Sequence, residues 1–458
     1  MIEFLPLFLF AAVCLLLMAG YPVALTLAGT ALIAASAGIV FGVFDPALLK
    51  AMPERVYGIM DNDTLIAVPL FILMGILLEK SKLAEDLLEN MAHVFGRFPG
   101  GLGIAVIIVG MLLAASTGIV GATVVAMGLM SLPTMLRRGF DPALATGTIC
   151  ATGTLGQIIP PSLALVLLGD VIANAYQQAQ LSQGLFNTQT VSVGALFAAA
   201  IIPGLLLVAA YLGYMVFVAH RFPERAPRAV PTEEARNVTG WVLARSLAPP
   251  ILLIICVLGS IVGGIATPTE AAGVGAAGAL ILGLQRGSMS WAILREALEG
   301  TLKTTSMVFL ILIGASMFSL VFRGYGGEEL VHSLMQNMPG GAYGALAMVM
   351  VVMFLLGFIL DFIEITFVVV PIMGPALLAM GFDPAWLGIM IAINLQTSFL
   401  TPPFGFALFY LRSVTPESVE TKMIYRGVVP FIIIQLVMLV VLCVFPALAT
   451  WLPGVMRG

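Results

Sequence analysis

Charged residues are scarce in this chain of 458 amino acids. They make up 10% of it, whereas a soluble domain carries roughly a quarter. Because 60% of the residues are hydrophobic, the shortage of charge excludes a soluble globular protein and predicts one that lies in a bilayer. The net charge of −4 leaves no basic face, so a nucleic-acid-binding protein is excluded as well.

Cysteine pairs and the common nucleotide and hydrolase motifs are also lacking. Cys14, Cys150, Cys256 and Cys443 lie one at a time in apolar segments, which excludes a disulfide framework or a paired-cysteine metal site. The sequence has no G-x-x-x-x-G-K-[ST] loop, no H-E-x-x-H and no G-x-S-x-G. ATP hydrolysis and familiar hydrolase chemistry are therefore not predicted. We expect a protein that is not an enzyme and has no cofactor.

Long apolar runs, in contrast, recur along the whole chain. A run of about 17 to 25 residues crosses a hydrocarbon core. The first run, Phe4 to Gly20, has no basic residue before it and no cleavage pattern after it, so we expect a retained helix rather than a signal peptide. We predict spanning helices at 4–20, 22–44, 64–80, 140–173, 194–219, 247–265, 270–284, 304–322, 385–411 and 428–448. They make an all-α, multi-pass membrane protein.

Two further apolar stretches, 101–133 and 342–378, have small or polar residues at their midpoints. We expect re-entrant hairpins there, because non-helical backbone at membrane depth must be buried in protein or line a wet cavity. The positive-inside rule supports this layout. With the N-terminus outside, 16 of the 20 basic residues fall on the cytoplasmic side. The four that fall outside are Lys50, Arg55, Arg323 and Arg457.

The two halves of the chain resemble each other. GFDPA at 139–143 recurs at 381–385, an offset of 242 that also relates Pro160-Pro161 to Pro402-Pro403. The charge count makes the two hairpins open to opposite sides, so the repeats are predicted to be inverted, as in elevator-type ion transporters. The predicted parts are a first repeat at 1–219 with hairpin 101–133 and broken helix 140–173, a cytoplasmic linker at 220–246, and a second repeat at 247–458 with hairpin 342–378 and broken helix 385–411.

The two broken helices are the first candidates for a binding site. Adjacent prolines remove backbone donors and leave carbonyls unpaired in a place without water, and a cation is one way to satisfy them. A simple proline kink satisfied by neighbouring helices is the alternative. The candidate residues are Gly153, Gly156, Pro160 and Ser162 in the first break, and Asn394, Thr397, Thr401, Pro402 and Gly405 in the second.

The hairpin midpoints supply the other candidates. Ser116, Thr117, Gly118 and Thr123 gather hydroxyls at the first turn, although small residues at this spacing also suit helix packing. At the second turn, Asp361 and Glu364 are carboxylates at membrane depth, which mark an ion or substrate path unless they are interfacial or protonated. Glu270, in TPTEA, is explained equally well by a helix cap and by a site.

Together these motifs resemble the large membrane subunit of the tripartite ATP-independent periplasmic (TRAP) transporters. The resemblance rests on YPVALTLAG, GTLGQIIPPS, TPTEAAGVGAAGALILG and NLQTSFLTPPFGFALF. The last of these, with LDFIEIT, is most similar to the mannitol/chloroaromatic subfamily, whose better-understood systems carry 2-oxo acids and related carboxylates. It implies a Na⁺-driven elevator in the bacterial inner membrane, a small four-helix partner subunit and a soluble periplasmic binding protein. It also maps the cation and substrate sites onto Thr117, Gly118, Ser162, Asp361 and Thr401 to Gly405. Ile119 departs from the family pattern, because many members have a serine there.

The sequence thus predicts a Na⁺-coupled importer subunit for small organic anions such as 2-oxo or hydroxy carboxylates. Within transport, the alternative is a self-sufficient Na⁺/carboxylate symporter, and outside it a channel or intramembrane enzyme. The binding protein in a tripartite system selects the substrate, so the identity of the acid is not expected to be written in this chain.

Overall fold

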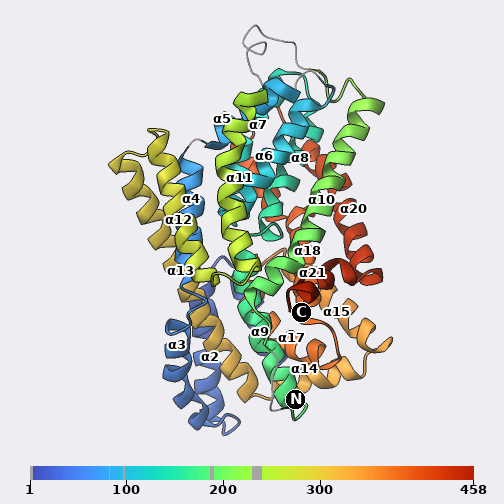
Figure 1. The fold of residues 1–458 in the computed structure, drawn as a ribbon. Coiled ribbons are helices and arrows are strands. Elements are labelled where there is room, and N and C mark those ends of the chain that lie inside the picture. The colour runs from blue at the N-terminus through green and yellow to red at the C-terminus, as the bar shows by residue number, and fades with distance from the viewer. Residues whose placement is uncertain (1–3, 82, 96–97, 186–189, 229–239, 458) are drawn as a thin grey trace. The chain divides into compact units, whose positions relative to one another are not determined.

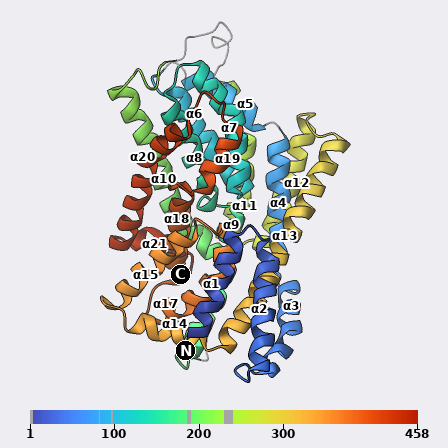
Figure 2. The same ribbon diagram turned by 180° about the vertical axis from the view of Figure 1, so that it is seen from behind.

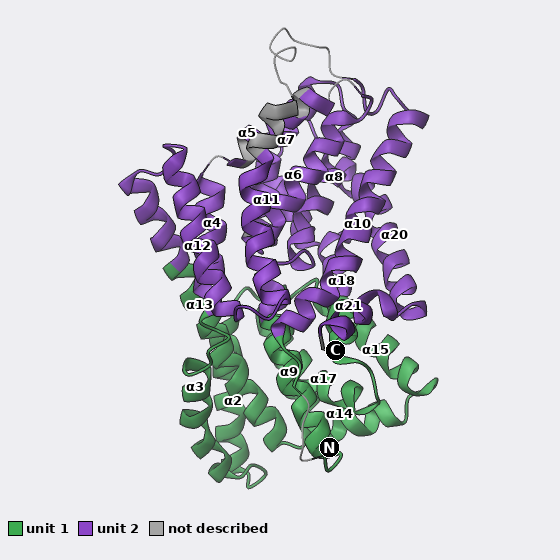
Figure 3. Cartoon of the chain, in the orientation of Figure 1, with its two compact units in different colours: residues 1–66, 167–192, 302–391 green, residues 67–166, 193–301, 392–458 purple. Residues whose placement is uncertain are grey.

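The computed structural model describes residues 4–457 except 82, 96–97, 186–189 and 229–239. Every regular element in this described part is a helix, which confirms the predicted all-α class. The chain divides into two compact units, and each takes segments from both halves of the sequence (Figure 3). Unit 1 comprises residues 1–66, 167–192 and 302–391, and unit 2 comprises 67–166, 193–301 and 392–458. Residues 229–239 of the predicted linker 220–246 lie outside the described residues.

Unit 1 contains the N-terminal helices and the second predicted hairpin. Within it, α14 contacts α1, α15 and α17, and α1 contacts α2. Its elements are α1 (Leu5–Met18), α2 (Val23–Val40), η2 (Pro46–Ala51), α3 (Met52–Met60), most of α9 (Leu163–Ser182), most of α13 (Trp291–Gly324), α14 (Gly327–Gln336), α15 (Gly341–Leu356), α16 (Phe362–Val368), α17 (Val370–Ala379) and the first half of α18 (Pro384–Leu400).

Unit 2 contains the first predicted hairpin, residues 140–166 of the first predicted broken helix and residues 392–411 of the second. Figures 1 and 2 show α4 beside α12, the most extensive helix pairing in the unit. Besides the remaining parts of α9, α13 and α18, its elements are α4 (Ala67–Lys80), α5 (Leu83–Phe95), α6 (Gly101–Thr117), α7 (Val120–Arg137), α8 (Pro142–Thr154), η3 (Leu155–Gln157), α10 (Val193–Arg221), α11 (Gly240–Val262), α12 (Pro268–Gln285), α19 (Phe406–Val414), α20 (Thr421–Val444) and α21 (Ala447–Arg457).

Five described helices are long and apolar enough to cross a membrane by themselves: α2, α7, α10, α13 and α20. One further bent pair, α16 and α17, passes the same test together and turns by 58° at its break. Helices α3 and α14 were not predicted from the sequence, and the predicted span in α13 begins at 304, whereas the helix begins at 291. These segments mix polar and apolar residues, so a search for long apolar runs does not find them.

The repeated GFDPA motif takes the same local structure in both places. Gly139 and Gly381 have left-handed backbone, with φ of 78° and 93°, which glycine adopts without a side-chain penalty. Two residues later, Asp141 accepts a hydrogen bond from the backbone of Ala143, and Asp383 accepts one from Trp386. Each motif therefore ends one helix and caps the next. The division of the whole chain into inverted repeats remains a prediction.

Glu270 belongs to a helix cap. Thr267 accepts from the Glu270 amide at 3.3 Å, and the Glu270 carboxylate accepts in return from the Thr267 amide at 2.8 Å. This reciprocal capping box satisfies two backbone donors that would otherwise be unpaired at the start of α12. Of the two interpretations that the sequence left open, the cap accounts for Glu270 fully.

Candidate functional site

The first hairpin turns at its predicted midpoint, within unit 2. Helix α6 ends at Thr117 and α7 begins at Val120, with Gly118 between them in left-handed backbone (φ 62°). The buried hydroxyl oxygens of Thr117 and Thr123 lie 2.6 Å apart across this turn. Each is also 3.0 Å from a backbone carbonyl one helical turn earlier. The side chain of Ser116 lies outside the described residues.

The first helix break packs directly against this turn. Helix α8 ends at Thr154, η3 follows, and α9 begins at Leu163. A Cβ on Gly118 would lie 2.8 Å from the Leu163 amide nitrogen, and one on Gly156 would lie 3.0 Å from the Ala114 carbonyl oxygen. Backbone therefore meets backbone at two points, which only glycine permits.

Side chains within the first break are buried. The Ser162 hydroxyl donates to the Gly156 carbonyl at 2.6 Å, which closes the loop that contains Pro160. Gly153 faces α7, where a Cβ would collide with the side chain of Val124. Of these four predicted residues, Gly153 is explained by helix packing, while Gly156, Pro160 and Ser162 form the break itself.

The second helix break lies in the same unit. Helix α18 ends at Leu400 and α19 begins at Phe406, and Thr397 and Thr401 each donate to a carbonyl one turn earlier at 2.7 Å. A Cβ on Gly405 would lie 2.5 Å from the Phe399 carbonyl oxygen, so this tight turn requires glycine. Asn394 is buried, and Pro402 is partly exposed at the break.

The two breaks are joined by residues that occupy equivalent places in the predicted repeats. Gln396 donates from Nε2 to the Thr154 hydroxyl at 3.3 Å, and these residues are 242 positions apart, the offset of the sequence repeat. In addition, α19 packs against α7 and α8. Unit 2 thus brings together the first hairpin tip and both breaks.

Two buried glutamines were missed by sequence analysis. Gln157 is 1% exposed, and neither its Nε2 nor its Oε1 has a hydrogen-bond partner within the described residues. In that same part of the chain, Oε1 of the fully buried Gln396 also has no partner. Since buried amides are nearly always paired, these atoms are candidates to contact a ligand. Their only sequence signal was an uncharged amide inside an apolar run.

Asp361 and Glu364 belong to unit 1, where they cap a helix. Asp361 Oδ1 accepts from the amides of Ile363 and Glu364 at 2.6 and 3.2 Å. The Glu364 carboxylate accepts in return from the Asp361 amide at 2.9 Å. Both carboxylates therefore have a local structural role at the start of α16. That they also serve a cation or substrate site remains a prediction.

Gly118→Ala is expected to lower uptake about tenfold and to reduce thermal stability, because left-handed backbone costs a non-glycine residue roughly 1–2 kcal/mol and the new Cβ meets the Leu163 amide. The measurements are substrate uptake in proteoliposomes and the unfolding temperature of the purified protein. Gly20→Ala is the matched control, since Gly20 has φ of 88° but nothing within 4 Å of a Cβ. Equal effects of the two changes would contradict a contact-specific role for Gly118.

Comparison with known proteins identifies the family. Residues 10–448 match the family described as tripartite ATP-independent periplasmic transporter, DctM component. The chain belongs to this TRAP family. It is 30% identical over 393 residues to the C4-dicarboxylate TRAP transporter large permease protein DctM of Pseudomonas aeruginosa, covering 85% of this chain and 86% of the relative. Its membership confirms the resemblance drawn from the motifs and places it among multi-pass inner-membrane proteins.

A further TRAP relative and a solved transporter structure extend this comparison. The chain is 29% identical over 394 residues to the isethionate TRAP transporter permease protein DctMQ of Oleidesulfovibrio alaskensis, covering 85% of this chain and 58% of that longer protein. In fold, it is similar to the YdaH transporter of Alcanivorax borkumensis, with a TM-score of 0.62, 15% identity, and coverage of 97% and 98% of the two chains. The DctM and DctMQ relatives are transporter permeases, and the likeness to YdaH shows the fold.

Proposed function

We propose that this TRAP permease imports small organic anions together with Na⁺. The observation that carries the proposal is the buried oxygen cluster of unit 2, where the first hairpin tip and both helix breaks meet. A hydroxyl that donates its proton to a carbonyl keeps lone pairs for a cation, and neutral oxygens suit a hard monovalent ion. Candidate ligands are the buried Thr117, Thr123, Gln157, Ser162, Gln396 and Thr397, together with the partly buried Thr401.

The substrate class is supported by the relatives. One is named for C4-dicarboxylates and another for isethionate, a hydroxy-sulfonate, so an anionic group is the feature that their substrates share. For this chain we propose small carboxylates, with 2-oxo and hydroxy acids as the first candidates.

The proposed partners are a small four-helix membrane subunit and a soluble periplasmic binding protein. The word tripartite in the family description supports both. The chain spans 58% of the DctMQ relative, and the remaining length of that relative agrees with a second membrane component there.

The test of this function is uptake of labelled pyruvate, lactate and succinate into proteoliposomes that contain the chain with its small subunit. We expect uptake to be at least about tenfold slower when the binding protein is left out, because delivery by that protein sets the local substrate concentration. Equal uptake by the chain alone would identify a self-sufficient symporter. Flux that does not saturate and only runs down a gradient would identify a channel.

A further inference from the structure

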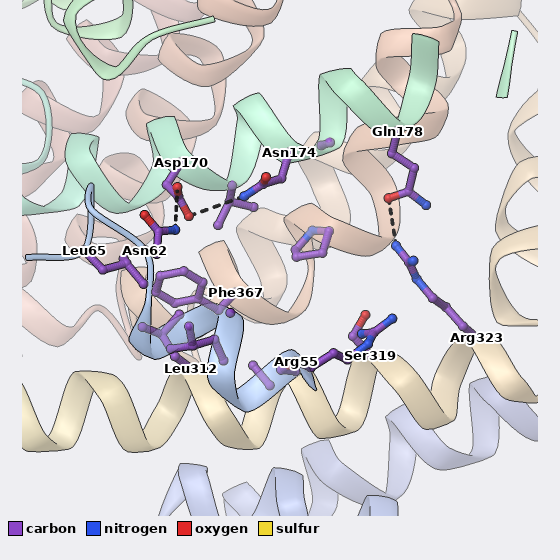
Figure 4. Close-up of a pocket in the computed structure, with 17 residues that line it drawn as sticks. Arg55, Asn62, Leu65, Asp170, Asn174, Gln178, Leu312, Ser319, Arg323 and Phe367 are labelled. Carbon is purple, nitrogen blue, oxygen red and sulfur yellow. Dashed lines mark hydrogen bonds between the residues drawn. The ribbon is translucent and has the colours of Figure 1, made fainter. Parts of the chain in front are cut away.

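A cavity of about 530 Å³ lies entirely within unit 1. Its walls come from α3 and the segment that follows it, from α9 and α13, and from α16 and α17 (Figure 4). None of its lining residues is among the predicted cation or substrate ligands. Two arginines, Arg55 and Arg323, line it together with polar side chains, so the cavity has the chemistry of an anion site.

The two arginines differ in how their charges are balanced. Arg323 Nε lies 2.7 Å from a Glu328 carboxylate oxygen, and its Nη2 donates to Gln178 at 2.7 Å. Arg55 is partly buried, and within the described residues it forms no hydrogen bond and no ion pair. Burial lowers the pKa of Arg55, the nearby Arg323 charge lowers it further, and Glu328 partly opposes both effects. An arginine stays protonated regardless. Arg55 therefore offers to the cavity a guanidinium that has no ion-pair partner among the described residues.

A second donor at the cavity wall also lacks a partner. Ser319 on α13 is 9% exposed, lines the cavity, and forms no hydrogen bond through its hydroxyl within the part of the chain that the structure describes. A carboxylate can accept hydrogen bonds from both a guanidinium and a hydroxyl, so it matches these two donors.

The Asp170 carboxylate gives the cavity a second kind of polar group. It accepts hydrogen bonds from the side-chain amides of Asn62 at 3.1 Å and Asn174 at 3.4 Å (Figure 4), and no arginine of the described residues forms an ion pair with it. An ionised carboxylate has about four acceptor sites, so two amides leave it able to accept from a hydroxyl. The cavity thus offers donors for an anion and an acceptor for a hydroxyl group.

We propose that this cavity is a capture site for small carboxylates, with the substrate carboxylate held by Arg55 and Ser319 and a hydroxyl, where present, donated to Asp170. The inference rests on the proposed transport function, which it extends by a second binding site. In the predicted orientation, Arg55 and Arg323 lie on the outer side of the membrane. This is the side from which a periplasmic binding protein delivers substrate. Arg323 stays paired with Glu328 and contributes its charge from the cavity wall.

The direct test is the modification of arginines by phenylglyoxal in the purified full-length chain in lipid nanodiscs. Peptide mass spectrometry would follow Arg55 and, as a reference, the exposed Arg295. With Na⁺ and ionic strength fixed, lactate or succinate is expected to slow modification of Arg55 about tenfold and to leave Arg295 unchanged. Ser319→Ala should raise the protecting concentration severalfold. Modification of Arg55 at the same rate with and without both acids would overturn the proposal.

Uptake by two variants separates this inference from the proposed function. Arg55→Gln removes the capturing charge, whereas Lys50→Gln removes an exposed charge on the neighbouring η2 helix that does not line the cavity. We expect at least tenfold slower uptake of subsaturating substrate for the first and wild-type uptake for the second. Normal uptake by Arg55→Gln would overturn the capture role and leave the transporter assignment standing. Protection of Arg55 in a chain that takes up no carboxylate would keep the site and overturn the proposed function.

Discussion

Replacing Asp361 by asparagine is expected to lower Na⁺-dependent uptake about a hundredfold, since hydrogen bonds and contacts to a charged group contribute roughly 1.5–3 kcal/mol. The protein should remain folded. Asparagine caps a helix as well as aspartate does, so its side-chain oxygen can still accept from the amides of Ile363 and Glu364. The change therefore removes the charge and keeps the cap. Uptake and thermal stability are measured together, with Na⁺ varied.

Three variants show whether any loss belongs to the charge of Asp361. Asp361→Ala also removes the cap and should lower stability by about 1 kcal/mol in addition. Glu364→Gln keeps an acceptor for the Asp361 amide and should be milder. Asp383→Asn makes the same chemical change at another capping aspartate and should transport normally. Wild-type uptake with unchanged Na⁺ dependence in Asp361→Asn would contradict the predicted role of that carboxylate in cation or substrate binding.

Uptake in choline medium is expected to fall to the level of empty liposomes. The proposed ligands in unit 2 are hydroxyl, amide and backbone oxygens, which do not titrate near neutral pH and cannot carry protons. They can hold Na⁺, whereas choline is too large and offers no compact charge. The measurement is initial uptake at a series of Na⁺ concentrations, with choline keeping the ionic strength constant.

Full uptake without Na⁺ under an imposed proton gradient would contradict Na⁺ coupling. It would indicate that the coupling ion is a proton carried in unit 1, where Asp361 and Glu364 are titratable and share one capping box. In that case Glu364→Gln would be as damaging as Asp361→Asn. The two experiments together therefore assign the coupling ion to one set of residues.

Local sequence signals predicted the backbone of the site well. The glycine and proline positions identified the turn at Gly118 and the breaks after Thr154 and Leu400, because backbone that departs from a helix needs these residues at each point. The repeated GFDPA motif was interpreted only as a sign of the internal repeat, and the structure shows that it also begins two helices. Here the determinants lie within a few residues of the feature they specify.

Local signals were only partly used for the acidic residues. TPTE and DFIE both fit the capping-box pattern, in which an acidic residue follows the cap three positions later. A cap was predicted as one alternative for Glu270 but not for Asp361 and Glu364, because carboxylates at membrane depth were interpreted as ion ligands. The same capping pattern is present in both sequences.

Features made by distant segments were beyond sequence reasoning. Gln157 lacks partners only because of what surrounds it in the folded unit, and a single sequence does not reveal that. Arg55 and Arg323 line one cavity although most of the chain separates them. Nothing in the spacing of either arginine distinguishes it from an ordinary charge in a connecting segment.

The interleaved composition of the two compact units has a consequence for synthesis of the protein. Unit 1 needs residues 1–66 and 302–391, and unit 2 needs 67–166 and 392–458. Although domains commonly fold one after another as they leave the ribosome, neither unit can be completed before the second half of this chain has been made. Part of the unit that contains the N-terminal helices is therefore made more than 200 residues after them. Cutting the chain at the central linker would separate both units from their missing parts, so neither fragment would carry a whole unit.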